Sequence, residues 1–239
     1  MSTIGIMQPY LFPYLGYFQL IALADTFVFF DTAQYIRRGW INRNNILLQG
    51  EAHRFTLPVV KAPRSTPIHA IELSEEVAVA TRNKLSTTLR SSYSSAPQFE
   101  AVMPLIDEVL NTQTVSIAVL LKRQFELLCS YMSIDTKLIW ASEVEWAEGA
   151  LGPQERILSM VCELGGSRYV NPVSGSALYS SERFSQRGVE LSFHAMNPVT
   201  YAQGTGTYVP NLSIIDLMMW NSKEELSQLL EDFTINSPV

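Results

Sequence analysis

Short apolar runs alternate with amphipathic stretches in the first and last parts of the chain. The first apolar run, Ile4–Met7, is followed by a helical stretch and then by a second apolar run, Phe27–Phe30. Near the other end we expect three strands and two helices in alternation: Lys137–Trp140, Pro153–Leu164, Arg168–Val170, Ala177–Gln186 and Val189–Phe193. Helices between short apolar strands are typical of right-handed βαβ crossovers. The pattern predicts an α/β fold with a mainly parallel sheet and flanking helices.

The middle of the chain shows helical periodicity instead. Helices are expected over Thr81–Tyr93, Gln98–Leu110 and Val115–Met132, and a small antiparallel hairpin over Asn45–Leu48 and His53–Val59. The tail, Asn211–Leu230, ends in an amphipathic segment. We therefore expect residues 1–239 to form a single α/β domain, with 75–135 as a helical insertion or subdomain.

Polar residues follow each predicted parallel strand. They are Gln8 after the first strand, Asp31 after the second, Ser142 after the third, Asn171 with Ser174 and Gly175 after the fourth, and His194 after the fifth. Because the carboxyl ends of parallel strands share one edge of a sheet, these residues are expected to border one crevice, where open α/β sheets bind ligands.

Charge is unevenly distributed. The chain has a net charge of −6, but residues 1–70 contain six Lys/Arg against three Asp/Glu, so the remainder carries −9. All six cations fall within 37–64: Arg37, Arg38, Arg43, Arg54, Lys61 and Arg64. A local basic patch on an acidic chain favours a discrete anionic ligand, such as a phosphate or nucleotide sugar, over a nucleic-acid backbone. A solvated hairpin face is an equally good reading.

Composition and motifs indicate in which compartment the protein works and whether it binds a metal. Two cysteines give no disulfide framework and suit a reducing compartment. The opening residues show no secretory signal, and the longest apolar stretch, Leu11–Phe30, is interrupted by Pro13, Gly16, Gln19 and Asp25, so no membrane span is expected. The three histidines are scattered, and neither HExxH nor a paired CxxC occurs. We expect a cytoplasmic protein that uses no metal or cofactor.

The common phosphate-binding motifs are absent from the sequence, which has neither GxxxxGK[ST] nor GxGxxG. The order strand, Pro-containing loop and helix is Rossmann-like and resembles the nucleotidyltransferase fold, whose HxGH motif opens the first helix. Here the register reads Tyr14-Leu15-Gly16-Tyr17. A phenol can donate a hydrogen bond but does not become a cation near neutral pH, so nucleotidyl transfer by that mechanism is not favoured.

Several long motifs resemble those of the WbqC-like family. They are QPYLFPYLGYFQLI, DTFVFFDTAQY and WINRNNI near the start, and YVNPVSGSALYSSERFSQRGVELSF and YVPNLSIIDLMMWNS near the end. The resemblance spans nearly the whole chain and is least distinctive over about 75–135. It implies a role in bacterial O-antigen, and hence lipopolysaccharide, biosynthesis, with transfer of glycine to a sugar. Positions matching these motifs are Gln8, Tyr10, Tyr14, Asp31, Gln34, Tyr35, Trp40, Asn42, Arg43, Asn171, Ser213 and Asp216.

Three residues are candidates for catalysis: Asp31, Arg43 and His194. Asp31 would act as a general base, kept ionised by neighbouring arginines, although capping the next turn is an equal alternative. Arg43, with Arg38, would clamp a phosphate or carboxylate, whereas surface ion pairing is the alternative. His194 titrates near neutrality, but a structural role is favoured over catalysis. Asp216 is expected to be partly buried and to pair with an N-terminal arginine.

The predicted substrate-binding residues are amides, aromatics and an arginine near the expected crevice. They are Gln8, Tyr10, Tyr14, Gln34, Tyr35, Arg38, Trp40, Asn42, Asn44, Asn171 and Ser174. The amides would bind an oxyanion or sugar hydroxyls, and the aromatics would stack on a sugar or base. Turn formation and core packing are the alternatives for some members of each group.

Together these features favour a transferase that moves a glycyl or other acyl group to a nucleotide- or phosphate-linked amino sugar. The acyl donor stays open between charged tRNA, a carrier-bound thioester and an acyl adenylate. Two alternatives remain: a nucleotide-dependent adenylating or nucleotidyl-transferring enzyme lacking the HxGH histidines, and a non-catalytic sugar-nucleotide binding protein.

Overall fold

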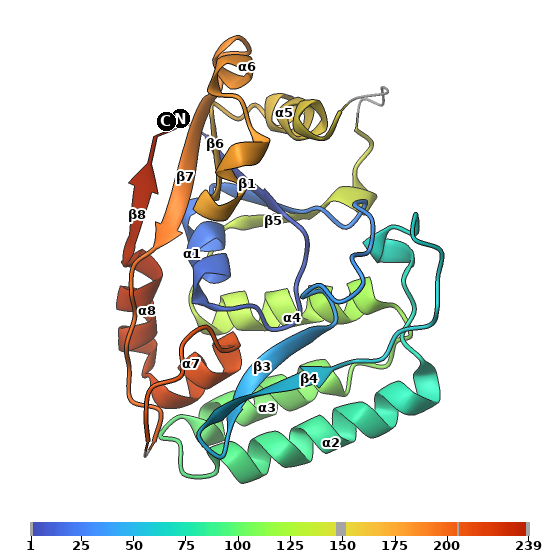
Figure 1. Ribbon diagram of the computed structural model, residues 1–239, viewed down its shortest axis with the longest axis vertical. Helices are drawn as coiled ribbons and strands as arrows, with labels where there is room; N and C mark the ends of the chain where they lie inside the picture. The colour runs from blue at the N-terminus through green and yellow to red at the C-terminus, as the bar shows by residue number, and fades with distance from the viewer. Residues whose placement is uncertain (1, 147–151, 205, 238–239) are drawn as a thin grey trace.

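The computed structural model describes residues 2–146, 152–204 and 206–237 and contains a six-stranded sheet (Figure 1). Its strands, in spatial order, are β5 (Lys137–Trp140), β2 (Thr26–Phe29), β1 (Thr3–Met7), β6 (Arg168–Pro172), β7 (Glu190–Met196) and β8 (Phe233–Asn236). All neighbours pair in parallel except β7 and β8. The predicted α/β class with a mainly parallel sheet is confirmed.

The strand order reverses between β1 and β6. From β1 the chain moves outward through β2 to β5, and it then returns to the other side of β1 for β6, β7 and β8. This is the doubly wound order of Rossmann-like sheets, which bind ligands beyond the carboxyl ends of the strands at the point of reversal.

Helices cover both faces of the sheet because its strands alternate between two cores. Phe27 and Phe29 face the larger core with α1 (Leu15–Leu23) and α4 (Ile117–Tyr131), whereas Val28 faces the smaller core with α5 (Pro153–Glu163). The ring of Phe125 from α4 lies 4.3 Å from that of Phe29, centroid to centroid. The smaller core also holds Phe184 of α6 (Ser181–Ser185).

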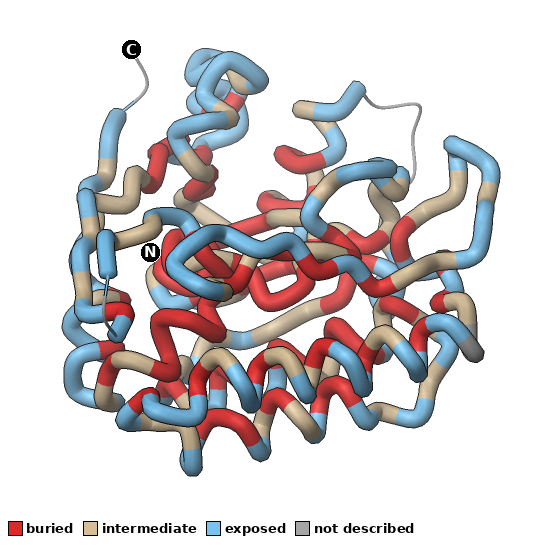
Figure 2. Tube along the Cα trace, turned by 60° about the horizontal axis from the view of Figure 1, so that its bottom comes forward, coloured by how far each residue is buried: buried red, intermediate tan, exposed pale blue. Residues whose placement is uncertain are grey.

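A layer of helices and a hairpin lie at one end of the molecule (Figure 1). The helices are α2 (Glu75–Tyr93), α3 (Phe99–Leu110), α4 and α7 (Ile214–Trp220), and α8 (Lys223–Glu231) packs beside α1. Along the long helices, buried residues recur on the inner side and exposed residues on the outer side (Figure 2). The hairpin joins β3 (Arg43–Leu48) to β4 (Glu51–Thr56) through Gln49 and Gly50, which both have positive φ, at 53° and 80°. Two such residues form the type I′ turn that suits the twist of paired strands.

Several predicted boundaries were wrong. The segment 177–186 is not one helix, because the 3₁₀ helix Val173–Leu178 precedes the short α6 and none of its six residues is buried. Helix α2 begins at Glu75, six residues before the predicted start, and β4 ends at Thr56. Two further 3₁₀ turns lie at Ile68–Ala70 and Ala141–Glu143.

The last parallel strands are longer than predicted. Asn171 lies within β6, and His194 lies within β7 between Pro172 of β6 and Ile235 of β8. The antiparallel edge strand β8 was not predicted, and its pairing extends β7 to Met196. Within the described ranges, no helix is both long and apolar enough to cross a membrane.

Candidate functional site

A pocket of about 290 Å³ lies between the loop that precedes β3 and the segment that follows β4. We call it the cationic pocket, because four of its lining residues are Arg37, Arg38, Arg43 and Lys61. The other lining residues are Tyr35, Asn42, Thr56, Val59, Val60, Ala62 and Ile71. Four predicted site residues thus meet here: Tyr35, Arg38, Asn42 and Arg43.

Hydrogen bonds within the first wall and between the two walls fix the shape of this pocket. The Tyr35 hydroxyl donates to Asn42 Oδ1 over 2.9 Å, and Asn42 Nδ2 donates to the carbonyl of Leu57 over 2.7 Å. Arg37 Nη2 donates to the carbonyl of Ala62 over 2.6 Å. Asn42 is 6% exposed, so its side chain supports the wall from behind. These three hydrogen bonds hold the lining residues of the pocket in place.

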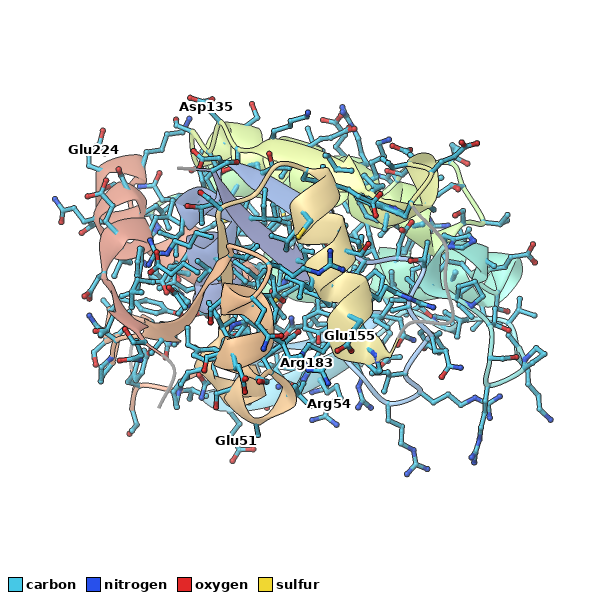
Figure 3. The ribbon with its side chains drawn as sticks, turned by 90° about the horizontal axis from the view of Figure 1, so that it is seen from above. Glu51, Arg54, Asp135, Glu155, Arg183 and Glu224 are labelled. Carbon is cyan, nitrogen blue, oxygen red and sulfur yellow. The ribbon has the colours of Figure 1, made fainter. Side chains whose placement is uncertain are left out.

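The cations of this region have no acidic partners within the described ranges of the chain. Among the residues that the structure describes, none of the six cations in 37–64 forms an ion pair, whereas Arg90, Lys122, Arg123, Arg168 and Arg183 all do. In Figure 3, Arg183 and Glu155 lie close together, and an ion pair joins Nη1 to Oε1 over 3.4 Å. Arg54, also labelled there, forms no ion pair in the described structure. Such a local excess of positive charge attracts anions even on an acidic protein.

Trp40 lies next to the cationic pocket. The Cζ atom of Arg43 is 5.9 Å from the centre of its ring, and that of Arg54 is 5.7 Å away. The backbone carbonyl of Trp40 accepts a hydrogen bond from the amide of Leu11, which ties the loop to the turn after β1. Trp40 is thus a fifth predicted residue at this site.

Buried amides hold the turn that follows β1. Asn44 Nδ2 donates to the carbonyls of both Leu11 and Phe12, and Gln124 accepts from the amide of Phe12 while donating to the carbonyl of Tyr10. Ser213 also donates to the carbonyl of Phe12, over 2.8 Å. These side chains form hydrogen bonds with backbone groups of a buried, irregular segment. Without such partners the buried backbone groups would cost free energy, because they have lost their hydrogen bonds with water. Asn44, predicted to bind substrate, here binds backbone.

The predicted tyrosines of the same turn pack against the core. The ring centres of Tyr10 and Tyr17 are 5.6 Å apart, and Tyr14 borders a small cavity with Tyr201 and Tyr208. The Tyr17 hydroxyl donates to the carbonyl of Gln8 over 2.8 Å, and burial raises the pKa of Tyr17 well above its usual value. Both tyrosines of the YLGY register are therefore neutral phenols near pH 7.

Asp31 lies outside the cationic pocket. It is 1% exposed, and its two oxygens accept hydrogen bonds from the amide and the hydroxyl of Ser142, over 2.9 and 2.5 Å. The carboxylate therefore connects the end of β2 to the turn after β5. Neither Arg38 nor Arg43, the cations expected beside it, forms an ion pair with it in the described structure.

His194 is buried beneath α1. Its Nε2 lies 3.0 Å from Oε1 of Gln19, whose amide nitrogen donates to the carbonyls of Leu229 and Asp232. Nε2 therefore carries the proton and donates to Gln19. Burial lowers the pKa of His194 to about 4, so the ring is neutral at pH 7.

The hydrogen-bond partners of Asp216 differ from the predicted one. The expected N-terminal arginine is not its partner, because Tyr93, Tyr201 and Gln203 donate to its oxygens over 2.8, 2.7 and 2.9 Å. The residue is fully buried, and burial raises the pKa of its carboxyl, against the effect of the three hydrogen bonds. Hydroxyl and amide donors thus take the place of a cation.

The remaining predicted residues lie near the point of strand reversal or on the surface. Gln8 follows β1, and Asn171 of β6 accepts from the Tyr169 hydroxyl over 3.1 Å. Ser174 is exposed in the 3₁₀ helix after β6, and Gln34 is exposed in an isolated bridge with Pro67. The structure does not bring these four into the cationic pocket.

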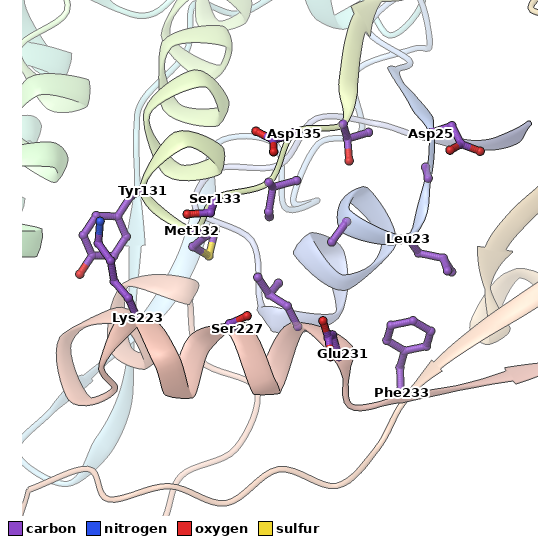
Figure 4. Close-up of a pocket in the computed structure, with 15 residues that line it drawn as sticks. Leu23, Asp25, Tyr131, Met132, Ser133, Asp135, Lys223, Ser227, Glu231 and Phe233 are labelled. Carbon is purple, nitrogen blue, oxygen red and sulfur yellow. The ribbon is translucent and has the colours of Figure 1, made fainter.

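A larger cavity, of about 620 Å³, lies beside the amino-terminal ends of β2 and β5, where α1, α4 and α8 border it (Figure 4). Its lining includes Asp25 just before β2, Asp135 before β5 and Glu231 at the end of α8. Lys223 lies over the ring of Tyr131, 4.5 Å from its centre. No predicted site residue lines this cavity.

Sequence reasoning missed three residues of the site and its support. Arg37 and Lys61 were counted in the charge cluster but not among the binding residues, although that cluster was itself the signal. Gln124 lies between Leu121 and Phe125 on the apolar face of α4, and a polar residue at such a position indicates a buried partner.

The fold and the pocket define a doubly wound α/β protein with a cationic pocket beside its hairpin. The chain belongs to the WbqC-like protein family, whose sequence model matches residues 8–228. It is 27% identical over 226 residues to Rv1507c, an uncharacterized protein of Mycobacterium tuberculosis (strain ATCC 25618 / H37Rv), and the match covers 91% of this chain and 93% of that protein. No solved structure matches the chain significantly.

Proposed function

We propose that the protein is a transferase of bacterial surface-polysaccharide biosynthesis, which moves a glycyl or other acyl group to a phosphate-linked amino sugar. The observation that carries this proposal is the cationic pocket. Its four cations form no ion pairs in the described structure, and its walls hold Tyr35 and Asn42 in fixed positions. The family resemblance supports the polysaccharide setting.

The pocket suits the phosphate of such a substrate. Arginine side chains bind phosphate through two parallel N–H···O bonds, and lysine adds a point charge. Arg43 Nε donates to the carbonyl of Gly39 over 2.8 Å, which leaves its terminal nitrogens to bind a ligand. The described lining contains no Asp or Glu that would repel an anion.

The proposed reaction is simple acyl transfer. The sugar amine attacks the acyl carbonyl carbon, a C–N bond forms, the bond to the donor's leaving group breaks, and a base accepts the amine proton. Asp31 stays the predicted base, and to accept this proton it would have to exchange a hydrogen bond with Ser142 for the substrate amine. Substitution Asp31→Asn should abolish turnover, and full turnover by that variant would remove Asp31 from the mechanism.

Binding and turnover can be tested separately. Calorimetry with a nucleoside-diphosphate-linked amino sugar should show at least about 10-fold weaker binding by Arg43→Gln and Lys61→Gln, because each loses a charge-assisted contact with phosphate. Arg187→Gln, which removes an exposed arginine after α6, is the matched control and should bind normally.

Mass spectrometry after incubation with glycyl-tRNA, an acyl thioester and an acyl adenylate then tests transfer. An acylated sugar amine identifies the donor. Tight binding that depends on Arg43 without product from any donor would instead support a sugar-nucleotide binding protein.

A second candidate, adenylyl or nucleotidyl transfer, is favoured by the strand order. The reversal between β1 and β6 is the position at which doubly wound sheets bind nucleotides. Tyr14 and Tyr17 occupy the histidine positions of the HxGH motif, so this chemistry would have to differ. ATP binding that is insensitive to Arg43→Gln, with release of pyrophosphate, would favour this candidate over acyl transfer.

A further inference from the structure

The register of the hairpin places two arginines next to the Trp40 ring. Arg43 pairs with Thr56, and Asn45 pairs with Arg54, so Arg43 and Arg54 project from the same face of β3–β4. Their Cζ atoms are 5.9 and 5.7 Å from the centre of the Trp40 ring. The ring therefore lies close to both guanidinium groups, and Trp40 is still 40% exposed.

The Trp40 ring does not belong to the core. The opposite face of the hairpin supplies the core residues, with Ile46 fully buried and Phe55 8% exposed, whereas Trp40 is 40% exposed. Its backbone is nevertheless fixed by the Leu11 amide. An exposed aromatic ring on a fixed loop, supported by cations, is a flat surface on which another ring can stack.

We propose that Trp40 stacks against the base of a nucleotide whose phosphate groups occupy the cationic pocket. This proposal rests on the proposed function, because it uses the same pocket for phosphate. Arg43 connects the two parts, since it lines the pocket and also contacts the Trp40 ring. The ligand is then one that carries a base next to its phosphate groups, and not a sugar phosphate or a lipid-linked sugar.

The chemistry of the ring supports a base over a sugar. Stacking of a base on an aromatic side chain tolerates any base and contributes roughly a 5- to 150-fold gain in affinity. A nucleotide fits this arrangement, because its base would stack on the Trp40 ring while its phosphates occupy the cationic pocket, with Arg43 between the two.

Two sources could supply this base and phosphate: a nucleoside diphosphate, or the unpaired end of an RNA that carries an acyl group. The shared chemistry is a base adjacent to phosphate. A short single-stranded RNA and uridine diphosphate distinguish them, because an RNA ligand binds tighter and loses affinity more steeply with salt as more phosphates are neutralised.

The test compares uridine diphosphate with inorganic pyrophosphate by calorimetry. Wild-type protein should bind the nucleotide at least about 5-fold more tightly. Trp40→Ala should lower nucleotide affinity to that of pyrophosphate and leave pyrophosphate affinity unchanged. Trp40→Phe, which keeps an aromatic ring, should retain a preference for the nucleotide.

Fluorescence adds an independent readout. Nucleotide should quench the emission of Trp40, and this quenching should vanish in Trp40→Phe. It should persist in Trp220→Phe, the matched control, because Trp220 lies in α7 and does not line the cationic pocket. This change also removes no hydrogen bond, since Trp220 Nε1 has no partner in the described structure.

Failure of the two proposals gives different results. Equal affinity of wild type for nucleotide and pyrophosphate, or unchanged nucleotide binding by Trp40→Ala, would overturn the stacking site alone. Pyrophosphate binding that is absent, or unaffected by Lys61→Gln, would reject the phosphate pocket and the proposed function with it.

Discussion

At the scale of single residues, the buried carboxylate of Asp216 is paired with neutral donors. Asp216 receives three such hydrogen bonds, from Tyr93, Tyr201 and Gln203, at a fully buried position. Tyr93 also accepts from the amide of Leu47 in β3, over 3.0 Å. This carboxylate therefore joins α7 to α2 and, through Tyr93, to the hairpin that carries the candidate site.

We predict that Asp216→Ala lowers the free energy of unfolding by about 3 kcal/mol, because it leaves three buried donors without an acceptor. Asp216→Asn keeps one acceptor oxygen and should lose less. Urea denaturation followed by circular dichroism measures both. Asp135→Ala, at an exposed carboxylate before β5, is the control and should stay within about 0.5 kcal/mol of wild type.

A second prediction at the scale of single residues concerns the dependence of stability on pH, through His194. The pKa of this buried imidazole is lowered to about 4 in the folded chain, against about 6.5 unfolded, so the unfolded chain binds more protons between these values. Stability should therefore fall as pH drops from about 6.5 to about 4.

Melting temperatures across that pH range measure the effect. His194→Gln keeps a donor for Gln19 without an ionisable ring, and it should flatten the slope. His53→Gln, at an exposed histidine, should not. An equally steep slope in His194→Gln would assign the acid sensitivity to other groups.

At the scale of elements, the turn after β1 holds Trp40, and with it part of the candidate site, in position. Phe12 has a positive φ of 41°, a strained conformation for a residue with a side chain, and side chains from α4, β3 and the start of α7 hold the turn. Through the Leu11 amide, the same turn fixes Trp40.

Gln124→Leu should cost about 2–4 kcal/mol of unfolding free energy, because the amide of Phe12 and the carbonyl of Tyr10 lose their shared partner inside the protein. It should also weaken nucleotide binding by releasing Trp40. Gln113→Leu, at an exposed glutamine, is the control for both measurements. Normal stability in Gln124→Leu would mean that water replaces the lost bonds.

The strands with strong apolar runs could be predicted from the sequence, and the contacts of the site could not. In the sequence, β1, β2 and β5 are recognisable as short apolar segments. By contrast, β8 consists of four residues of alternating exposure, and its partner β7 is distant in the sequence. Asn44 and Gln124 reach backbone 33 and 112 residues away, and no local pattern records such contacts. The cation cluster is visible in the sequence, and four of its six members line the cationic pocket.

At the scale of the whole molecule, a positive pocket lies on a protein of net charge −6. The overall field repels anions, so binding of a phosphate ligand has to come from the local cations, and salt screens that attraction over about 10 Å at 0.1 M. We predict that raising sodium chloride from about 50 to about 200 mM weakens binding of uridine diphosphate several-fold. Arg43→Gln should show a shallower dependence, because it has one cation fewer to screen.

The comparison of slopes makes this prediction specific. Arg187→Gln changes the net charge by the same amount outside the pocket, so it should keep the wild-type slope. If both variants showed equal slopes, the net charge of the protein, and not the pocket, would control binding. A shallower slope in Arg43→Gln alone would place the anion against the residue that connects the cationic pocket to Trp40.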